Sequence, residues 1–226
     1  HRRGLVYPCV CTRKDLESYQ SAPNAGEDLL ENRYPGLCRG RFASGGEARE
    51  ESGREPAWRF RVTDSEAVGF EDGFHGRREG VLWDWAGDFP VARGDKAGYQ
   101  LAVVADDHLM GVTEVVRGDD LLPSTQRQLA LYTALGWEPP AFYHVPLVIG
   151  PDGRRLAKRH GDTRLSVLRN AGKGPERVLG WLAWSCGWAD ELAKIPLAEI
   201  RKKCDFSRIP KEPVAVTSEA MRWLEL

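Results

Sequence analysis

The amino-acid sequence predicts an α/β fold with a loop-rich N-terminal part and a helical C-terminal part. Segments between residues 55 and 115 alternate apolar and polar side chains or form short apolar runs, as strands do. From Ser124 onward apolar residues recur every three or four positions, which is typical of helices. A chain of 226 residues can bury a sizeable core. We expect three regions, residues 1–54, 55–150 and 151–226.

The first region, residues 1–54, is polar and has few apolar residues. "SAPNAGEDLL" and "ASGGEAREESGREP" are expected to form loops, because Gly, Pro, Ser and Asn gather in them. "TRKDLESYQ" is expected to form a short helix with Thr12 as its N-cap. Such a segment has little core of its own, so a bound metal would help to hold it together.

The second region is expected to be rich in strands. "AWRFRVTD" alternates in polarity, which indicates a half-buried strand, and "VLWDWAGDFPVAR" is similar. In "YQLAVVADDHLMGVTEVVRGDDLL" two apolar runs flank an expected turn at "DDHLMG". The run "LAVVA" fits either an interior strand or the start of a buried helix, because periodicity alone does not separate the two.

The remainder of the chain is predicted to be largely helical. "STQRQLALYTALG" has cap candidates at its start and ends at Gly136, and "FYHVPLVIG" is expected to be a short strand. "LSVLRNAG" and "GPERVLGWLAWSCGWA" are expected to be helices. The second of them has Pro175 near its start, where a missing N–H costs nothing.

Composition excludes several classes of protein. The net charge of −1 provides no overall field toward nucleic acid, so a site for a polyanion must be a local patch. There is no apolar run long enough for a transmembrane helix, and "HRRGLVYPCVC" lacks the apolar stretch of a signal peptide. Of the five cysteines, three lie in residues 9–38, which favours a reduced, cytoplasmic setting over a disulfide framework.

The clustered cysteines predict a small zinc site. Three thiols stand as Cys9-x-Cys11 and, after a long loop, Tyr34-x3-Cys38. Three residues are candidates for a fourth ligand: Tyr34, Cys186 and Cys204. The alternative is that these are ordinary buried cysteines without a metal.

Two basic features are candidates for binding anions. In "PDGRRLAKRHGD", residues 151–162, a turn leads into a loop whose Lys and Arg side chains suit a polyphosphate, although a solvated basic turn is the alternative. Arg117 follows the apolar run "VTEVV" and is placed to hold a carboxylate in a bidentate manner. The alternative for Arg117 is an ion pair with Asp119 or Asp120.

A long part of the chain resembles a known family. "YQLAVVADDHLMGVTEVVRGDDLLPSTQRQLALYTALGW", followed by "HVPLVIGPDGRRLAKRHGD", closely resembles the catalytic core of glutamyl-tRNA synthetases. The resemblance covers approximately residues 75–190. It implies an α/β class I aminoacyl-tRNA synthetase catalytic domain of Rossmann type, with a small zinc-binding insertion and a helical C-terminal part.

The resemblance also implies roles for individual residues. "RLAKR", residues 155–159, stands where class I synthetases carry their KMSKS loop, so Lys158 is the implied catalytic residue. Arg155, Lys158 and Arg159 are implied to bind ATP as its Mg²⁺ complex. Ala157 replaces the serine of the motif, which removes one hydroxyl contact to phosphate. Tyr99 and Arg117 are implied to hold glutamate.

Three features resemble one branch of this family, which attaches glutamate to the queuosine base of tRNA(Asp). In that branch a zinc ion has a tyrosine as its fourth ligand, which matches the set Cys9, Cys11, Tyr34 and Cys38. Val103 stands where ordinary glutamyl-tRNA synthetases tend to carry Asn. Only 67 residues follow Arg159, too few for a large anticodon-binding domain. The implied partners are glutamate, ATP and the anticodon loop of tRNA(Asp), and a monomer is expected.

One family feature is missing from the sequence. The family begins with a strand, a HIGH-like motif, and an Arg and a Glu that bind glutamate, and none of these is present. We expect that a further N-terminal segment carries them. The alternatives are the catalytic half of a discriminating glutamyl-tRNA synthetase and a catalytically dead, zinc-stabilised RNA-binding module.

Overall fold

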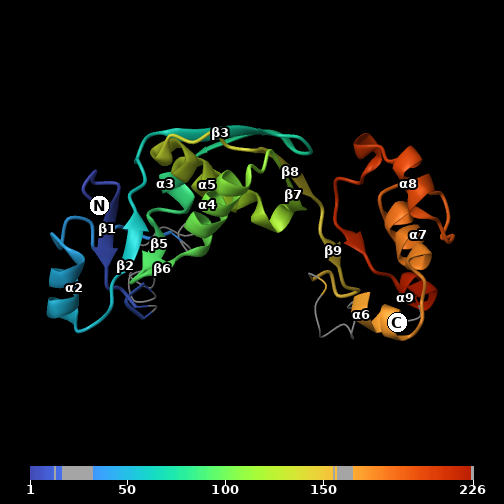
Figure 1. The fold of residues 1–226 in the computed structure, drawn as a ribbon, viewed down its shortest axis with the longest axis horizontal. Coiled ribbons are helices and arrows are strands. Elements are labelled where there is room, and N and C mark those ends of the chain that lie inside the picture. The colour runs from blue at the N-terminus through green and yellow to red at the C-terminus, as the bar shows by residue number, and fades with distance from the viewer. Residues whose placement is uncertain (13, 17–32, 155, 157–164, 225–226) are drawn as a thin grey trace. The chain divides into compact units, whose positions relative to one another are not determined.

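The structure is a computed structural model, and it describes residues 1–12, 14–16, 33–154, 156 and 165–224 (Figure 1). The described residues belong to two compact units. Unit 1 comprises His1–Val116 and Leu121–Tyr143, and unit 2 comprises Arg117–Asp120 and His144–Leu226. The domain boundaries predicted near residues 54 and 150 do not coincide with the boundaries of these units, and they stay a prediction.

Two four-stranded sheets carry most of the strands (Figure 1). The first has the order β1-β2-β5-β6 with antiparallel neighbours. Its strands are β1 (Val6–Cys9), β2 (Ala57–Phe60), β5 (Phe89–Arg93) and β6 (Lys96–Ala97). The second has the order β4-β3-β8-β7, in which β3 is antiparallel to β4 and parallel to β8. Its strands are β3 (Ala67–Asp72), β4 (Gly76–Val81), β7 (Glu114–Gly118) and β8 (Ala141–Val145).

Four helices of the described ranges lie between these strands in the chain, and an apolar core forms where the last two of them pack against the first sheet. They are α2 (Gly45–Ser52), α3 (Leu82–Trp85), α4 (Tyr99–Met110) and α5 (Leu122–Leu135), the last preceded by a 3-10 turn at Asp119–Leu121. Val104 of α4 and Tyr132 of α5 pack in one buried cluster with Phe60 and Phe89 of the first sheet. Burying these side chains fixes α4 against β5 and so places its first turn beside the sheet.

Unit 2 is built from short helices and a two-stranded parallel sheet (Figure 1). Its elements are β9 (Val148–Ile149), α6 (Leu165–Asn170), α7 (Pro175–Ser185), α8 (Leu197–Lys203), a 3-10 turn (Phe206–Arg208), β10 (Val214–Ala215) and α9 (Ser218–Leu224). Its core includes Trp181, Val216 and Leu224. Gly180 is required in α7, because a Cβ there would lie 1.8 Å from the carbonyl oxygen of Ala193. None of the helices in the described ranges is long and apolar enough to cross a membrane.

Several local predictions are confirmed. The helix α5 ends at Gly136, whose φ of +72° is the left-handed conformation that glycine adopts readily, and Pro175 is the first residue of α7. Thr12 begins the helical turn at residues 14–16, where its Oγ1 accepts from the backbone N–H of Asp15 at 3.2 Å. The strand β2 lies within "AWRFRVTD". The stretch "SAPNAGEDLL" lies outside the described residues.

The loop expected at "ASGGEAREESGREP" is wrong, because residues 45–52 form helix α2. Ser44 accepts a hydrogen bond from the backbone N–H of Glu47 at 3.1 Å, and Glu47 accepts one from the backbone N–H of Ala43 at 2.5 Å. These two bonds form a variant of the capping box in which Glu47 reaches the residue before the N-cap, and Ala48 anchors the helix in a buried position. Gly45 and Gly46 had favoured a loop, because glycine is a poor helix former.

Three further expectations need correction, and one open alternative is resolved. "LAVVA" is part of helix α4, and the expected turn "DDHLMG" is the end of that helix, which stops at Gly111. "LWDW" is the short helix α3 rather than a strand; within that stretch Val81 ends β4 and Phe89–Arg93 forms β5. Helix α5 begins at Leu122, two residues before the expected cap, with Pro123 in its first turn. Burial against the sheet decided these cases, because the apolar runs fit both periods.

A buried carboxylate connects three segments of unit 1. Asp88 is fully buried, and its Oδ1 accepts from Arg39 Nη2 at 2.6 Å and from the backbone N–H of Val62 at 2.8 Å. Its Oδ2 accepts from Arg39 Nε at 2.5 Å and from the hydroxyl of Tyr7. Burial and the hydrogen bond to Asp88 raise the pKa of Tyr7, so this hydroxyl stays a donor. The carboxylate therefore joins β1, the turn after Cys38 and the end of β2.

Replacing this carboxylate should destabilise the protein much more than replacing an exposed one. For Asp88→Asn we expect the free energy of unfolding to fall by about 3 kcal/mol, because the partly buried Arg39 loses its ionic partner. Asp64→Asn is the matched control: Asp64 contacts the same guanidinium at 3.0 Å but is 63% exposed. It should cost less than about 1 kcal/mol. Urea unfolding measures both variants, and equal losses would contradict the role of Asp88.

Candidate functional site

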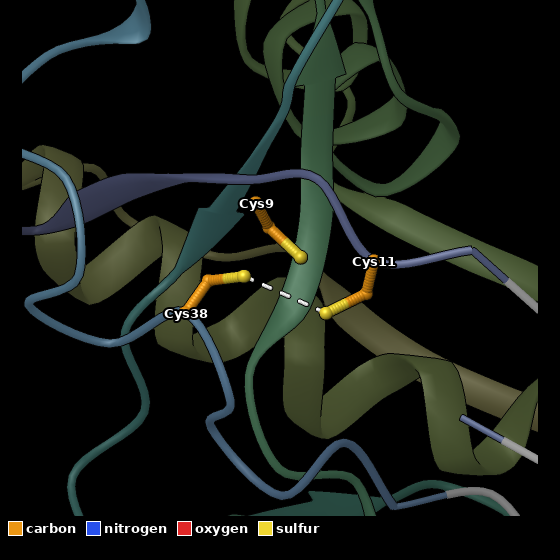
Figure 2. A group of neighbouring side chains, drawn as sticks. All are labelled: Cys9, Cys11 and Cys38. Carbon is orange, nitrogen blue, oxygen red and sulfur yellow. Dashed lines mark hydrogen bonds between the residues drawn. The ribbon is translucent and has the colours of Figure 1, made fainter. Parts of the chain in front are cut away.

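Three cysteines that are distant in sequence converge in unit 1. Cys9 ends strand β1, Cys11 follows it, and Cys38 comes from the turn after Tyr34 (Figure 2). The three Sγ atoms lie within 4.8 Å of one another, and the Sγ atoms of Cys11 and Cys38 are 3.5 Å apart. Cys9 and Cys38 are buried, and all three are free thiols. The pairing of β1 with β2 fixes the position of Cys9 opposite Ala57.

The hydroxyl of Tyr34 points into the same group. Its oxygen lies 3.3 Å from Cys9 Sγ and 3.5 Å from Cys11 Sγ, and it accepts from the backbone N–H of Cys38 at 3.0 Å. Tyr34 is held by a backbone bridge to Gly87, where a Cβ would lie 2.1 Å from the carbonyl oxygen of Tyr34. Three sulfur atoms and one oxygen atom thus surround one point, which suits the four-coordinate geometry of a thiophilic divalent ion.

Arg59 supports this group from outside. Its Nε donates to Cys9 Sγ at 3.2 Å, its guanidinium lies over the ring of Tyr34 at 3.6 Å, and its Nη1 donates to the carbonyl oxygen of Asp88 at 2.8 Å. Hydrogen bonds from Cys11 and Cys38 hold the pKa of the Cys9 thiol far below its ordinary value, and Arg59 acts in the same direction. Burial raises the pKa of Tyr34. A thiolate at Cys9 is the form that binds metals.

A cavity of about 760 Å³ in unit 1 adjoins this group. Tyr34 and Arg59 line it, and so do Tyr99 and Gln100 from the first turn of α4. Tyr99, predicted to hold glutamate, is 56% exposed. The structure thus brings Tyr99 and the fourth candidate metal ligand to the same cavity.

The other predicted residues lie elsewhere in the chain. Arg117 is on strand β7, in the part of that strand that belongs to unit 2. Its Nε donates to Nε2 of His144 at 2.9 Å, and His144 on β8 is fully buried. The sequence interpretation missed His144, although its position two residues after Phe142 places both on the inward face of one strand. Lys158, Arg155 and Arg159 lie outside the described residues.

The chain is similar to known proteins over most of its length. A sequence model of the family described as "tRNA synthetases class I (E and Q), catalytic domain" matches residues 2–223. A glutamyl-Q tRNA(Asp) synthetase of Symbiobacterium thermophilum is 46% identical over 219 residues, which are 96% of this chain and 67% of that protein. A glutamate–tRNA ligase of Desulforamulus reducens is 34% identical over 225 residues, which are 98% of this chain and 46% of that protein.

A solved structure supports the fold. The glutamate tRNA ligase of Elizabethkingia meningosepticum superposes with a TM-score of 0.73 at 23% identity, covering 97% of this chain and 49% of that one. At this identity the likeness shows the fold alone. The chain spans about two thirds of the length of the Symbiobacterium relative and about half of the other two proteins.

The thiol cluster predicts that metal content depends on Cys38 and not on a cysteine elsewhere. The purified protein should carry about one tightly held divalent metal ion per chain, as structural sites of this kind do. Cys38→Ser should lose most of it, because a buried ligand is removed. Cys204→Ser, at an exposed position in unit 2, should keep it. Elemental analysis after dialysis against a weak chelator measures the content, and equal metal in both variants would exclude this cluster as the site.

Proposed function

Because the chain belongs to the class I tRNA synthetase family that serves glutamate and glutamine, we propose that it activates glutamate with ATP and transfers it to queuosine in tRNA(Asp). The observation that carries this proposal is the higher identity to a relative named glutamyl-Q tRNA(Asp) synthetase than to a glutamate–tRNA ligase. The arrangement of Tyr34 beside three thiols, which the sequence shares with that branch, also supports it.

The proposed reaction has two steps. An oxygen of the α-carboxylate of glutamate attacks the α-phosphorus of ATP, and pyrophosphate leaves with the bonding electrons of the broken P–O bond. A hydroxyl group of the modified base then attacks the carbonyl carbon of the glutamyl adenylate, loses its proton, and releases AMP. Neither step needs a covalent bond to the protein, so positioning and charge stabilisation supply the catalysis.

Individual residues would contribute to these steps. Tyr99, which lines the cavity described above, would hold glutamate, and so would Arg117. His144 holds Nε of Arg117, which fixes the plane of the guanidinium so that its two Nη groups suit a carboxylate. Lys158, with Arg155 and Arg159, would stabilise the triphosphate of ATP, which binds with Mg²⁺.

We further propose that the thiol cluster holds zinc. Cys9, Cys11, Cys38 and Tyr34 would supply four protein ligands, which leave no open position for chemistry. The role would be structural, since this part of unit 1 has only a small apolar cluster of its own. The free cysteines suit a reducing compartment such as the cytoplasm, and the protein would act as a monomer.

The acceptor assay tests the function. With the protein as its gene encodes it, labelled glutamate should be transferred to tRNA(Asp) carrying queuosine and not to the same tRNA lacking it, because the reacting hydroxyl belongs to the modified base. Periodate treatment should abolish labelling, because it destroys the vicinal diol of queuosine. Since periodate also destroys the 3′ ribose, the tRNA lacking queuosine is the deciding control. Equal labelling of both untreated tRNAs would instead indicate a glutamate–tRNA ligase.

Two substitutions should separate binding of glutamate from stabilisation of the transition state. In glutamate-dependent ATP–pyrophosphate exchange without tRNA, Arg117→Ala should raise the KM for glutamate by about 30-fold or more, because a lost charged partner costs about 2–5 kcal/mol. Lys158→Ala should lower kcat by about 100-fold with a smaller change in KM, because its contact matters most in the transition state. An unchanged KM in Arg117→Ala would remove that residue from the glutamate site.

A further inference from the structure

Among the described residues that line the cavity of unit 1, cations outnumber carboxylates. Its basic lining residues are Arg33, Arg59, Arg93, Lys96 and Arg127. The only carboxylate among the lining residues in the described ranges is Asp88, which is fully buried and already bound by Arg39 and Tyr7. Arg59 is engaged with Cys9 and Asp88, so four cations remain without a matching carboxylate among the described lining residues.

Two of these cations come from directly opposite positions on neighbouring strands. Arg93 on β5 and Lys96 on β6 are direct partners across an antiparallel pair. Like charges in that position destabilise a sheet, and neither side chain forms an ion pair with another residue that the structure describes. Arg93 and Lys96 also line a second hollow, together with Asp95 of the intervening turn and with Glu55, which is paired with Arg49. An anion between Arg93 and Lys96 would relieve the repulsion.

The other two cations are held by aromatic rings. The guanidinium of Arg33 lies 4.5 Å from the ring centroid of Trp83, and that of Arg127 lies 4.7 Å from the ring centroid of Trp85. The Nε atom of each is buried and has no hydrogen-bond partner among the described residues. Stacking on a ring face fixes the guanidinium plane and directs the N–H edges away from the ring, where they suit phosphate oxygens. Burial lowers the pKa of Arg127.

We propose that Arg33, Arg93, Lys96 and Arg127 form a binding site for the phosphate backbone of the RNA strand that enters this cavity. The inference rests on the proposed function and names the residues that would hold its RNA substrate. The cavity volume of about 760 Å³ is in the range of a site for one nucleotide-sized group. Glutamate has a net charge of −1, so it does not account for four cations, whereas consecutive RNA phosphates do.

Phosphate could also come from ATP, so the experiment has an arm for each source. The test variant is Arg93→Gln with Lys96→Gln, both exposed, so the fold should be kept. The matched control is Arg77→Gln with Arg78→Gln, which removes two exposed cations from strand β4 of the same unit. The Kd for queuosine-containing tRNA(Asp) is measured against salt concentration for the parent protein and both variants. The Kd for ATP is measured in parallel, and thermal unfolding verifies that both variants fold.

At about 0.1 M salt the test variant should bind tRNA(Asp) about tenfold more weakly than the control variant does. The slope of log K against log salt should fall in magnitude by about 1.4, because two phosphate contacts are lost and each is worth about 0.7 on a single strand. Equal tRNA affinity of the two variants would overturn the proposal, and so would weaker ATP binding with unchanged tRNA binding. Because tRNA binding is measured without glutamate transfer, a failed acceptor assay would refute the proposed function and leave this test readable.

Discussion

The buried carboxylate of Asp88 is the constraint on which the arrangement of unit 1 depends. Arg39 follows Cys38 directly, and Tyr7 lies two residues before Cys9 on the same strand, and both bind this one carboxylate. The position of Asp88 therefore determines where the thiols of both segments meet. A buried carboxylate is costly to desolvate, and four donors are needed to compensate for it.

Arg59 links that constraint to the thiol group and to the cavity. One guanidinium contacts Cys9, the ring of Tyr34 and the carbonyl of Asp88, and it also lines the cavity wall. Three thiols and a phenol placed together accumulate negative charge when they deprotonate, and an adjacent cation stabilises that charge. Tyr34 and Arg59 thus belong both to the candidate metal centre and to the lining of the candidate substrate cavity. Fixing these two side chains at the metal centre also fixes that part of the cavity.

The distribution of charge explains how a nearly neutral chain can serve a polyanionic substrate. The formal net charge is −1, so long-range attraction of RNA by the whole molecule is weak. Positive charge is instead concentrated in the cavity of unit 1 and in the basic stretch 151–162. Local concentration of this kind favours a specific approach over general adhesion to nucleic acid, because the attraction is felt mainly within a Debye length of the site.

Sequence alone identified the features that act over a few residues: the Cys9-x-Cys11 spacing, the helix ends at Gly136 and Pro175, and the ordered motifs of the family. It did not separate strand from helix in "LAVVA", because burial of Val104 against the sheet decided that case. The burial of Asp88 and His144, and the gathering of cations into one cavity, were decided only by tertiary structure. Local propensity acts within a turn or a strand, whereas these groups meet through strand pairing between distant segments, which no local pattern records.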